Sequence, residues 1–381
     1  MKILITNSFY PPYHVGGDAT HCKYLAEALV QEGHEVHVIF SYDAYALKKA
    51  YGQKEENWNG VKVHKIKSPL KKLEPILNYL FGTQFYTYWY FKKLVWKEKF
   101  DVVHHHNISL LGSKILKKIG DYKNIYTAHD YWLICPKYDY FRNGKVCTIK
   151  NSPTCVSCCL KHKKPYPVHY ITLHNYLKSI DAVIAPSAYL GEKFRRAGIE
   201  NVVVINNFVP EYKGKLIKPE FKNYFLFVGQ LENHKGIIPL IQNFIELNKE
   251  LVIMGSGSLK EDVITLIEDH PNIHYLGFQN QEKVYSLMKF ANAVILPSQW
   301  PENNSMVILE SYMLGTPAIA SDMGGNRELI EKVSKDLCFD LFCFEDLKDI
   351  IKIFEKSKYT KKIDTSFKKY YRKYKYYFSF K

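Results

Sequence analysis

The sequence lacks any apolar run long enough for a membrane-spanning helix, although 46% of its residues are hydrophobic. It begins with a short apolar stretch that soon meets Pro11 and Pro12, so we expect no secretory signal peptide there. Both absences predict a cytoplasmic protein. Its eight cysteines are then expected to be reduced thiols or metal ligands rather than disulfides.

Acidic residues are also scarce. The chain has 38 Asp and Glu against 53 Lys and Arg, which gives a formal net charge of +15 over 381 residues. Such an excess favours an anionic partner: nucleic acid, an acidic membrane surface or a phosphorylated substrate. Charge alone does not distinguish between these. The length exceeds that of one typical hydrophobic core and predicts two domains.

Strands alternate with helices twice along the chain, which predicts an α/β protein with two doubly wound parallel sheets. In the first half, apolar runs predict strands at 3–5, 36–40, 61–66, 102–104, 125–127, 182–185 and 202–205. The second half restarts with expected strands at 224–228, 251–254, 273–276, 293–296 and 318–320. Asp18 is expected to cap the first helix, which ends at Gly33. Ligands of such sheets bind at the carboxyl ends of the strands, so we expect the active site in the cleft between the domains.

The segment 297–329 places two glutamates around the start of one helix. Two prolines disfavour a helix before Ser305, which can serve as its N-cap. Glu302 then lies in the loop and Glu310 in the second helical turn. The free backbone amides at the helix start and the positive end of the helix dipole suit a polyhydroxylated, phosphorylated ligand.

The spacing E-x7-E, followed by G-T-P-A-I-A-S and G-G-N-R-E, resembles the donor-sugar site of glycosyltransferase family 4. These are retaining nucleotide-sugar enzymes with the GT-B fold. The resemblance implies that Glu310 binds the ribose hydroxyls of the nucleotide and that Glu302 helps to place the donor sugar. Sugar hydroxyls would be held by the backbone between them, at Asn303, Asn304, Ser305 and Met306. An ordinary amphipathic helix with two solvated acids is the alternative.

A second segment, F-V-G-Q-L-E-N-H-K-G at 227–236, resembles the family's G-R-x(n)-K-G element, whose Arg and Lys grip the donor diphosphate. Lys235 matches the lysine, whereas Gln230 stands where the arginine usually is. One cation that would stabilise the leaving group is thus missing. Arg327 is the candidate substitute, with a solvated surface residue as the alternative. In the family, the turn that contains Gly255 and Gly257 lies near the nucleotide.

The first half has two further points of resemblance. V-G-G-D forms a loop without side chains at Gly16 and Gly17, where a sugar phosphate can approach the backbone. Y-T-A-H-D ends a strand, and His129 matches the family histidine that faces the donor sugar. A simple turn and a packed histidine are the alternatives. Three adjacent histidines at 104–106 cannot all face one metal from regular structure, so we interpret them as a polar rim of the cleft.

Five cysteines fall within 25 residues, in an insertion at 135–165 that follows His129. Some family 4 members are similar to this chain in carrying such an insertion. Its cysteines suit a tetrahedral structural zinc site made by Cys135, Cys147, Cys155 and Cys158. One Cys-x2-Cys pair is present, whereas a typical zinc ribbon has two. Free buried thiols or a disulfide are therefore the alternative.

Two segments suggest contact with large anionic partners. Residues 75–97 combine Trp, Tyr and Lys at helical spacing, which suits a bilayer interface and a lipid-linked acceptor, or else a core-facing helix. The tail alternates Lys with aromatic residues and could stack on single-stranded nucleic acid. Family 4 chains, however, commonly end in a helix that crosses back onto the first domain. We favour that interpretation and expect no nucleic-acid partner.

The resemblance implies a GT-B protein with an acceptor-side domain at 1–206, a nucleotide-sugar domain at 207–360 and a tail at 361–381. The implied function is retaining, hexosyltransferase-type transfer from a UDP- or GDP-linked sugar to a hydroxyl of a glycan or lipid-linked acceptor. We expect Glu302, His129 and Lys235 to carry out catalysis without a metal cofactor, in the cytoplasm or at the cytoplasmic face of a membrane. The rival predictions are a zinc-containing nucleic-acid-binding protein and a GT-B protein that binds without catalysing.

Overall fold

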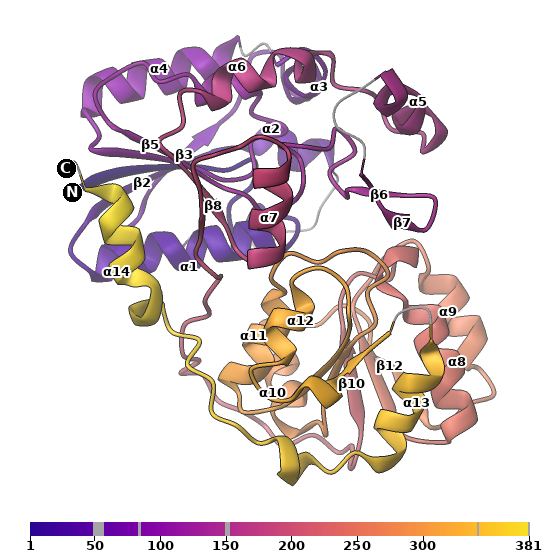
Figure 1. Cartoon of the computed structure of the whole chain (residues 1–381). Helices are drawn as coiled ribbons and strands as arrows, with labels where there is room; N and C mark the ends of the chain where they lie inside the picture. Colours follow the sequence, from indigo (N-terminus) through magenta and orange to yellow (C-terminus); the bar gives the residue numbers. More distant parts are fainter. Residues whose placement is uncertain (49–56, 83–84, 149–152, 341–342, 380–381) are drawn as a thin grey trace. The chain divides into compact units, whose positions relative to one another are not determined.

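The computed structural model describes residues 1–48, 57–82, 85–148, 153–340 and 343–379. The chain divides into two compact units. Residues 1–207 and 367–381 form the first unit, and residues 208–366 form the second. Each unit is built around a parallel sheet flanked by helices (Figure 1). The two parallel α/β sheets predicted from the sequence are therefore confirmed.

The sheet of the first unit has the strand order β3-β2-β1-β4-β5-β8-β9. Its strands are rich in Val and Ile and mostly buried, as expected for a parallel sheet covered on both faces. In the register, Ile5 lies opposite Val38 on one side and His104 on the other. The strands are β1 (Lys2–Thr6), β2 (Glu35–Ser41), β3 (Lys62–Ile66), β4 (Val102–His105), β5 (Lys123–Thr127), β8 (Ala182–Ala185) and β9 (Val202–Val204).

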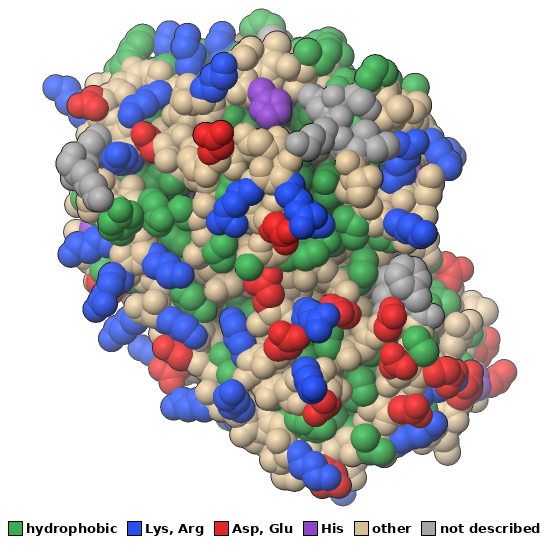
Figure 2. All heavy atoms as spheres, viewed as in Figure 1, with side chains coloured by type: hydrophobic (Ala, Val, Ile, Leu, Met, Phe, Trp, Pro, Cys, Tyr) green, Lys and Arg blue, Asp and Glu red, His purple; other side chains and the backbone are tan. Residues whose placement is uncertain are grey.

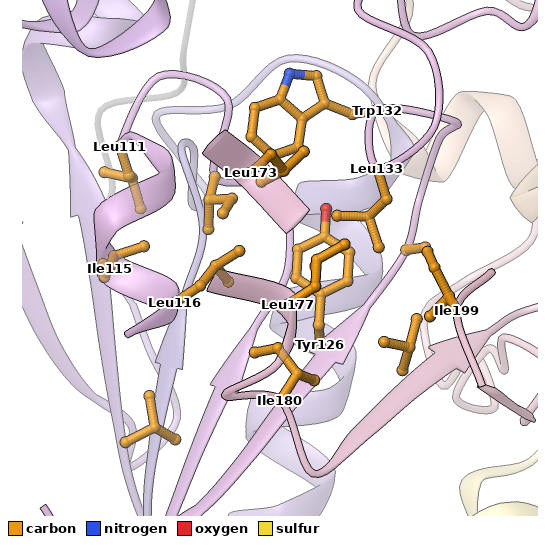
Figure 3. Packing of buried hydrophobic residues seen from close by; sticks show 14 of the residues in the cluster. Leu111, Ile115, Leu116, Tyr126, Trp132, Leu133, Leu173, Leu177, Ile180 and Ile199 are labelled. Carbon is orange, nitrogen blue, oxygen red and sulfur yellow. The ribbon is translucent and has the colours of Figure 1, made fainter. Parts of the chain in front are cut away.

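Helices cover both faces of this sheet. Figure 1 shows α3, α4 and α6 on one face and α1 and α14 on the other. The helices are α1 (Gly17–Gln31), α2 (Tyr42–Leu47), α3 (Leu73–Phe81), α4 (Tyr86–Glu98), η1 (Ser113–Leu116), η2 (Val168–Thr172), α6 (Leu173–Leu177), α7 (Ala188–Arg196) and α14 (Phe367–Phe378). Between α6 and the sheet lies an apolar cluster in which Leu173, Leu177 and Tyr126 pack together (Figure 3).

The second unit has the strand order β12-β11-β10-β13-β14-β15. Its strands are β10 (Phe225–Val228), β11 (Leu251–Met254), β12 (Ile273–Tyr275), β13 (Val294–Leu296), β14 (Ala318–Ser321) and β15 (Cys338–Phe339). The helices are η3 (Asn233–Lys235), α8 (Ile237–Leu247), α9 (Lys260–Ile267), α10 (Gln281–Phe290), α11 (Met306–Met313), α12 (Asn326–Ile330), η4 (Lys335–Leu337), α13 (Phe344–Ile353) and η5 (Lys356–Tyr359). The short edge strand β15 was not predicted from the sequence.

The segment 75–97 is not one helix, so that part of the prediction is wrong. Helix α3 ends at Phe81, because Gly82 follows in the left-handed region at φ 63°. A Cβ atom at Gly82 would lie 2.7 Å from the ring of His169 in η2, so this position also needs a glycine for close packing. Helix α4 then starts at Tyr86; residues 83 and 84 lie outside the described part of the chain.

The start of α1 also differs from the prediction. Gly16, with φ 87°, occupies the N-cap, and Asp18 lies inside the first helical turn rather than at the cap. The carboxylate of Asp18 instead accepts a hydrogen bond of 3.0 Å from Nδ2 of Asn107, which follows β4. The predicted end of the helix is confirmed, since Gly33 has φ 83° directly after the last turn.

Charge is divided unevenly between the units. The first contains 35 Lys and Arg against 16 Asp and Glu, and the second 18 against 22, so the excess of positive charge lies in the first unit. Figure 2 shows Asp and Glu gathered over part of one face, whereas Lys and Arg are spread widely. Within the described residues, every helix is too short or too polar to cross a membrane.

Candidate functional site

In the second unit, Glu302 lies in the loop after β13 and is held by three donors. Its Oε1 atom accepts hydrogen bonds from Lys235 Nζ at 2.5 Å, Ser298 Oγ at 2.8 Å and Trp300 Nε1 at 2.9 Å. The Lys235 ammonium also lies 5.3 Å from the centre of the Trp300 ring. The predicted catalytic residues Glu302 and Lys235 are thus brought together, 67 positions apart in the sequence.

These contacts determine the charge of Glu302. Burial by itself would raise the pKa of this carboxyl group, but the charge of Lys235 and the hydrogen bonds from Lys235, Trp300 and Ser298 outweigh it and lower the pKa below its usual value. Glu302 is therefore an anion at neutral pH, paired with a cation. Both side chains keep a solvent-accessible edge, 15% for Glu302 and 22% for Lys235, so a ligand can reach them.

Glycines allow the loops of this site to approach one another. Gly324 has φ 68°, and a Cβ atom there would lie 2.2 Å from the backbone oxygen of Glu302. The next residue, Gly325, donates its backbone N–H to that oxygen at 2.6 Å. On the other side, a Cβ atom at Gly236 would lie 2.0 Å from the backbone oxygen of Pro297. A side chain at Gly236 would push the Lys235 loop away from the loop of Glu302, and one at Gly324 would displace the Glu302 backbone.

Glu310 lies in the second turn of α11, as predicted, and half-buried. Its Oε1 accepts a hydrogen bond of 3.1 Å from the hydroxyl of Tyr285 in α10. Burial raises the pKa of Glu310 to about 7, although the hydrogen bond from Tyr285 acts in the opposite direction. The two glutamates thus differ in electrostatics: Glu302 is paired with a cation, and Glu310 is held by a neutral donor.

The segment between the two glutamates forms the start of α11. Ser305 occupies the predicted N-cap position, but its side chain makes no capping hydrogen bond, and Met306 is the first helical residue. Asn304 is buried, and Asn303 is half-buried beside it. The amides at the helix start therefore lie in the segment that joins Glu302 to Glu310.

The glycines predicted to face the nucleotide have a packing role in the structure. A Cβ atom at Gly255 would lie 1.8 Å from the backbone oxygen of Gly229, and one at Gly257 would lie 2.4 Å from that of Leu231. The turn after β11 therefore rests on the loop after β10. Gln230 lies exposed in that loop, between the two contacts. Whether these residues bind the nucleotide stays a prediction.

Arg327 is engaged elsewhere on the surface. Its Nη1 lies 2.8 Å from Asp322 and its Nε lies 2.8 Å from Glu331. The side chain is 58% exposed, which agrees with the solvated alternative. A phosphate contact by Arg327 would require these ion pairs to break, so its role as substitute for the missing arginine stays a prediction.

In the first unit, polar residues at the carboxyl ends of β1, β4 and β5 lie beside the start of α1, where Gly16 is the N-cap and Gly17, predicted in a loop, is the first helical residue. Nδ1 of His106 lies 2.8 Å from Nε2 of His129, and the two rings are stacked with centroids 5.1 Å apart. Burial lowers the pKa of His129 to about 4, so its imidazole is neutral. The ring is half-buried and remains accessible from one side.

The three adjacent histidines are fully buried, so their interpretation as a polar rim is wrong. Alternation along β4 sends their rings to opposite faces of the sheet. The ring of His105 lies on the α4 side, where its nitrogens contact Thr6 Oγ1 at 2.8 Å and Asn124 Oδ1 at 3.0 Å. His104 lies on the other face, against Tyr374 and Phe378 of α14.

Several residues of these sites were not predicted. Burial raises the pKa of Asp18 to about 6 and that of Asp130 to about 7. The H-D pair at 129–130 is a signal that could have drawn attention to Asp130. Tyr285, which orients Glu310, lies in an ordinary amphipathic helix and carries no such signal. G-G-N-R-E was recognised as a motif, but the role of Gly324 as the support of Glu302 depends on a contact between distant loops.

The cysteine insertion contains the hairpin β6 (Phe141–Arg142) and β7 (Lys145–Val146) and helix α5 (Pro153–Lys161). The four predicted zinc ligands and Cys159 line one small cavity. Among the residues described, no three of these sulfurs lie within 4.8 Å of one another. Burial raises the pKa of Cys135 to about 12 and that of Cys159 to about 11. Without a metal, these two thiols are therefore protonated.

Comparison with known families accounts for most of the chain. Residues 15–211 match the family described as Glycosyltransferase Family 4. Residues 208–374 match the family described as Glycosyl transferases group 1. The boundary between the matches falls at the boundary between the two units.

Individual relatives agree with this assignment. An uncharacterized glycosyltransferase of Methanocaldococcus jannaschii is 29% identical over 360 residues, which cover 87% of this chain and 83% of the relative. The Escherichia coli UDP-Gal:alpha-D-GlcNAc-diphosphoundecaprenol alpha-1,3-galactosyltransferase is 26% identical over 277 residues, covering 68% and 65%. The catalytic domain of Arabidopsis thaliana starch synthase IV, solved with ADP and acarbose, is similar in fold, with a TM-score of 0.69, 13% identity and coverage of 99% and 98%.

Proposed function

The chain belongs to glycosyltransferase family 4, and from this premise we propose that it transfers a hexose, with retention at the anomeric carbon, from a UDP- or GDP-linked donor to a glycan or lipid-linked acceptor. The protein is a glycosyltransferase of the GT-B fold that uses a nucleotide-sugar donor. The family match favours this function over the two rival predictions, a nucleic-acid-binding protein and a non-catalytic GT-B protein. Proteins of this kind generally need no catalytic cofactor.

The single observation that supports the proposed chemistry best is the contact of Lys235 with Glu302 beside the start of α11. A half-buried ammonium can stabilise the negative charge that develops on a departing diphosphate. Glu302 fixes the position of that ammonium and, by the resemblance, helps to place the sugar. We propose that Glu310, oriented by Tyr285, accepts hydrogen bonds from the ribose hydroxyls of the nucleotide.

Retention is proposed to follow from displacement on one face of the sugar. The bond from the anomeric carbon to the phosphate oxygen breaks as the acceptor oxygen attacks from the same side. The proton of the acceptor hydroxyl moves to the departing phosphate, so no protein base is required. We assign the sugar-facing role to His129 on sequence resemblance alone; its ring is neutral and is hydrogen-bonded to His106.

Donor hydrolysis tests this mechanism without knowledge of the acceptor. The protein is incubated with UDP- and GDP-hexoses, and NMR records which anomer of the free sugar appears first. We expect the anomer with the configuration of the donor, released before mutarotation. A first product of opposite configuration would rule out retention, whichever donor is used.

We further propose that the first unit binds the cytoplasmic face of an anionic membrane, where a lipid-linked acceptor would be found. Its excess of Lys and Arg supports this. So do the exposed aromatic side chains of α4, where Trp89 is 52% and Trp96 59% exposed, and the ammonium groups of Lys92 and Lys93 lie over these rings. The opposite side of α4, with Phe91 and Val95, is buried in the core.

Vesicle sedimentation tests the membrane contact. Wild-type protein should bind vesicles that contain anionic lipid and be released by salt, because exposed charges are screened over about 10 Å at 0.1 M. Changing Trp89 and Trp96 to Ser should weaken binding at low salt, whereas changing the exposed Phe290 of the second unit to Ser should not. Wild-type protein that ignores anionic vesicles at low salt would refute the membrane contact.

For the cysteine insertion we propose a structural zinc ion bound by Cys135, Cys147, Cys155 and Cys158. The shared cavity supports this, and so does the small size of the hairpin and α5, which offer little apolar core of their own. Zinc bonds to sulfur at about 2.3 Å, so binding would draw the sulfurs together. Purified protein should contain zinc with sulfur ligands, and Cys158→Ser should lose it. Zinc-free protein with unchanged stability would contradict this proposal.

A further inference from the structure

Three histidines from distant parts of the first unit form a compact group. His21 lies in α1, His106 directly follows β4 and His129 follows β5. One ring nitrogen from each lies within 4.8 Å of the corresponding nitrogen of the other two. His21 and His106 are almost completely buried, whereas His129 is half-buried and opens the group to solvent. An ion therefore has a path of entry.

The hydrogen bonding of this group is incomplete. Nε2 of His106 and Nδ1 of the neighbouring His104 are buried without a hydrogen-bond partner among the residues that the structure describes. Buried polar atoms nearly always have a partner, but Nδ1 of His106, and not this orphan Nε2, is the atom that faces His129, so the convergence of the three rings is the observation that indicates an ion. A water molecule could satisfy one nitrogen. It would not explain why three imidazoles converge on one point without a carboxylate among them.

His105 shows what a structural histidine looks like in the same strand. Its ring lies on the opposite face of the sheet, and both of its nitrogens have partners, Thr6 and Asn124. Nothing about His105 calls for a ligand. His106, one residue further along the chain, differs: one of its nitrogens is buried without a hydrogen-bond partner among the described residues, and its ring belongs to the converging group.

A second group of potential ligands, Glu35, His37 and Glu98, differs in its neighbours. Lys62 contacts Glu35 at 2.6 Å, and Lys2 contacts Glu98. Both carboxylates are therefore neutralised by ammonium groups, which a metal ion would have to displace. In the histidine group, by contrast, the rings contact one another, and the group itself contains no carboxylate.

We propose that His21, His106 and His129 bind one divalent transition-metal ion, with zinc as the ion that suits three imidazoles and an open fourth position. Burial keeps the rings neutral, which metal binding requires. The ion would separate Nδ1 of His106 from Nε2 of His129 slightly beyond their present 2.8 Å. Because His129 belongs to the proposed donor site, a bound ion would also inhibit transfer. That consequence rests on the proposed function, whereas binding itself does not.

The experiment compares zinc content in full-length wild-type protein, His106→Asn and His105→Asn after equilibration with excess Zn²⁺ and dialysis. We expect wild type and His105→Asn to retain one more zinc ion per chain than His106→Asn. X-ray absorption should show this ion bound by nitrogen at about 2.0–2.1 Å, distinct from sulfur-bound zinc at about 2.3 Å. Wild-type protein with sulfur-bound zinc only, or with none, would overturn the proposal whatever the variants do.

A second variant covers misfolding of His106→Asn, which circular dichroism would reveal. His21→Asn should lose the same ion while keeping its helical signal, and equal nitrogen-bound zinc in folded His21→Asn and wild type would contradict the site. One equivalent of zinc should reduce donor turnover at least fivefold in wild type but not in His21→Asn. Nitrogen-bound zinc in a protein that turns over no donor would contradict the proposed function and leave the metal site standing.

Discussion

The two units build their sites in different ways. In the second unit, glycines bring backbone loops together, so that Lys235 and Glu302 meet where a Cβ atom at Gly236 or Gly324 would clash. In the first unit, buried side chains converge from the ends of separate strands, as His106 and His129 do. The second unit is slightly acidic and the first strongly basic. Both units therefore join residues that are distant in the sequence, the second through close backbone contacts at glycines and the first through packed side chains.

The largest effect is expected from removing the cation of the second unit. Lys235→Ala should lower the rate of donor turnover by roughly 10²–10³-fold, the usual cost of losing one group that stabilises charge in a transition state. Lys260, exposed on α9, offers a matched control, and Lys260→Ala should keep the wild-type rate. Steady-state kinetics on both variants would measure this. Similar rates for the two would show that the site of the second unit lies elsewhere.

Two glycines with similar backbone angles sharpen the comparison between the units. Gly324 in the second unit has φ 68° and faces the Glu302 backbone, while Gly33 in the first has φ 83° and open space where a Cβ atom would lie. Gly33→Ala should cost only backbone strain, about 1–3 kcal/mol of unfolding free energy. Gly324→Ala should cost more, because the Glu302 loop must also move, and should weaken donor binding. Denaturant unfolding and donor titration would test this, and an equal cost for both with normal binding would refute it.

A smaller effect concerns pH. Glu310 has a pKa of about 7, above the usual value for glutamate, and binding ribose hydroxyls requires its ionised form. Donor affinity should therefore fall by up to about tenfold per pH unit below 7 and level off above 8. The stability of the ligand-free protein should respond in the opposite sense. Between about pH 4.5 and 7, Glu310 keeps a proton in the folded state that it has released in the unfolded chain. The free energy of unfolding should therefore fall as the pH rises through this range.

Variants from the two units separate this effect from other groups. Glu310→Gln should flatten the pH dependence of donor affinity. Asp130→Asn removes a carboxyl group of similarly raised pKa in the first unit. It should leave the midpoint of the pH dependence of donor affinity unchanged. Calorimetric titrations between pH 5.5 and 8.5 would show the difference; a midpoint that moves only in Asp130→Asn would assign the titration to the first unit.

The sequence allowed both sheets and the position of Glu302 and Glu310 around α11 to be predicted, because alternating apolar runs and a short motif are local signals. The break at Gly82 was missed, since a helical spacing of apolar residues continues across it and only the contact with His169 shows why a glycine is there. The histidine group was missed for a related reason. No spacing connects His21 with two residues that follow strands much later in the chain.

Arg327 shows the limit of transferring a role from a motif. It is the arginine of G-G-N-R-E and was a candidate to replace the missing arginine, yet its guanidinium is paired with Asp322 and Glu331. A sequence motif does not specify which charged side chains lie close enough in space to form surface ion pairs. The cysteine spacing has the same limit: it predicts that Cys135, Cys147, Cys155 and Cys158 line one cavity, but the distances between their sulfurs depend on how the hairpin and α5 pack.

Donor binding by the second unit is the central claim, and one titration tests it most directly. Wild-type protein and Glu310→Ala are titrated with UDP- and GDP-hexoses, with circular dichroism as the check on folding. Wild type should bind at least one donor, and Glu310→Ala should bind it at least about 100-fold more weakly, because two hydrogen bonds to a charged group are lost at about 1.5–3 kcal/mol each. Equal affinity in a folded Glu310→Ala protein would contradict the placement of the nucleotide at α11.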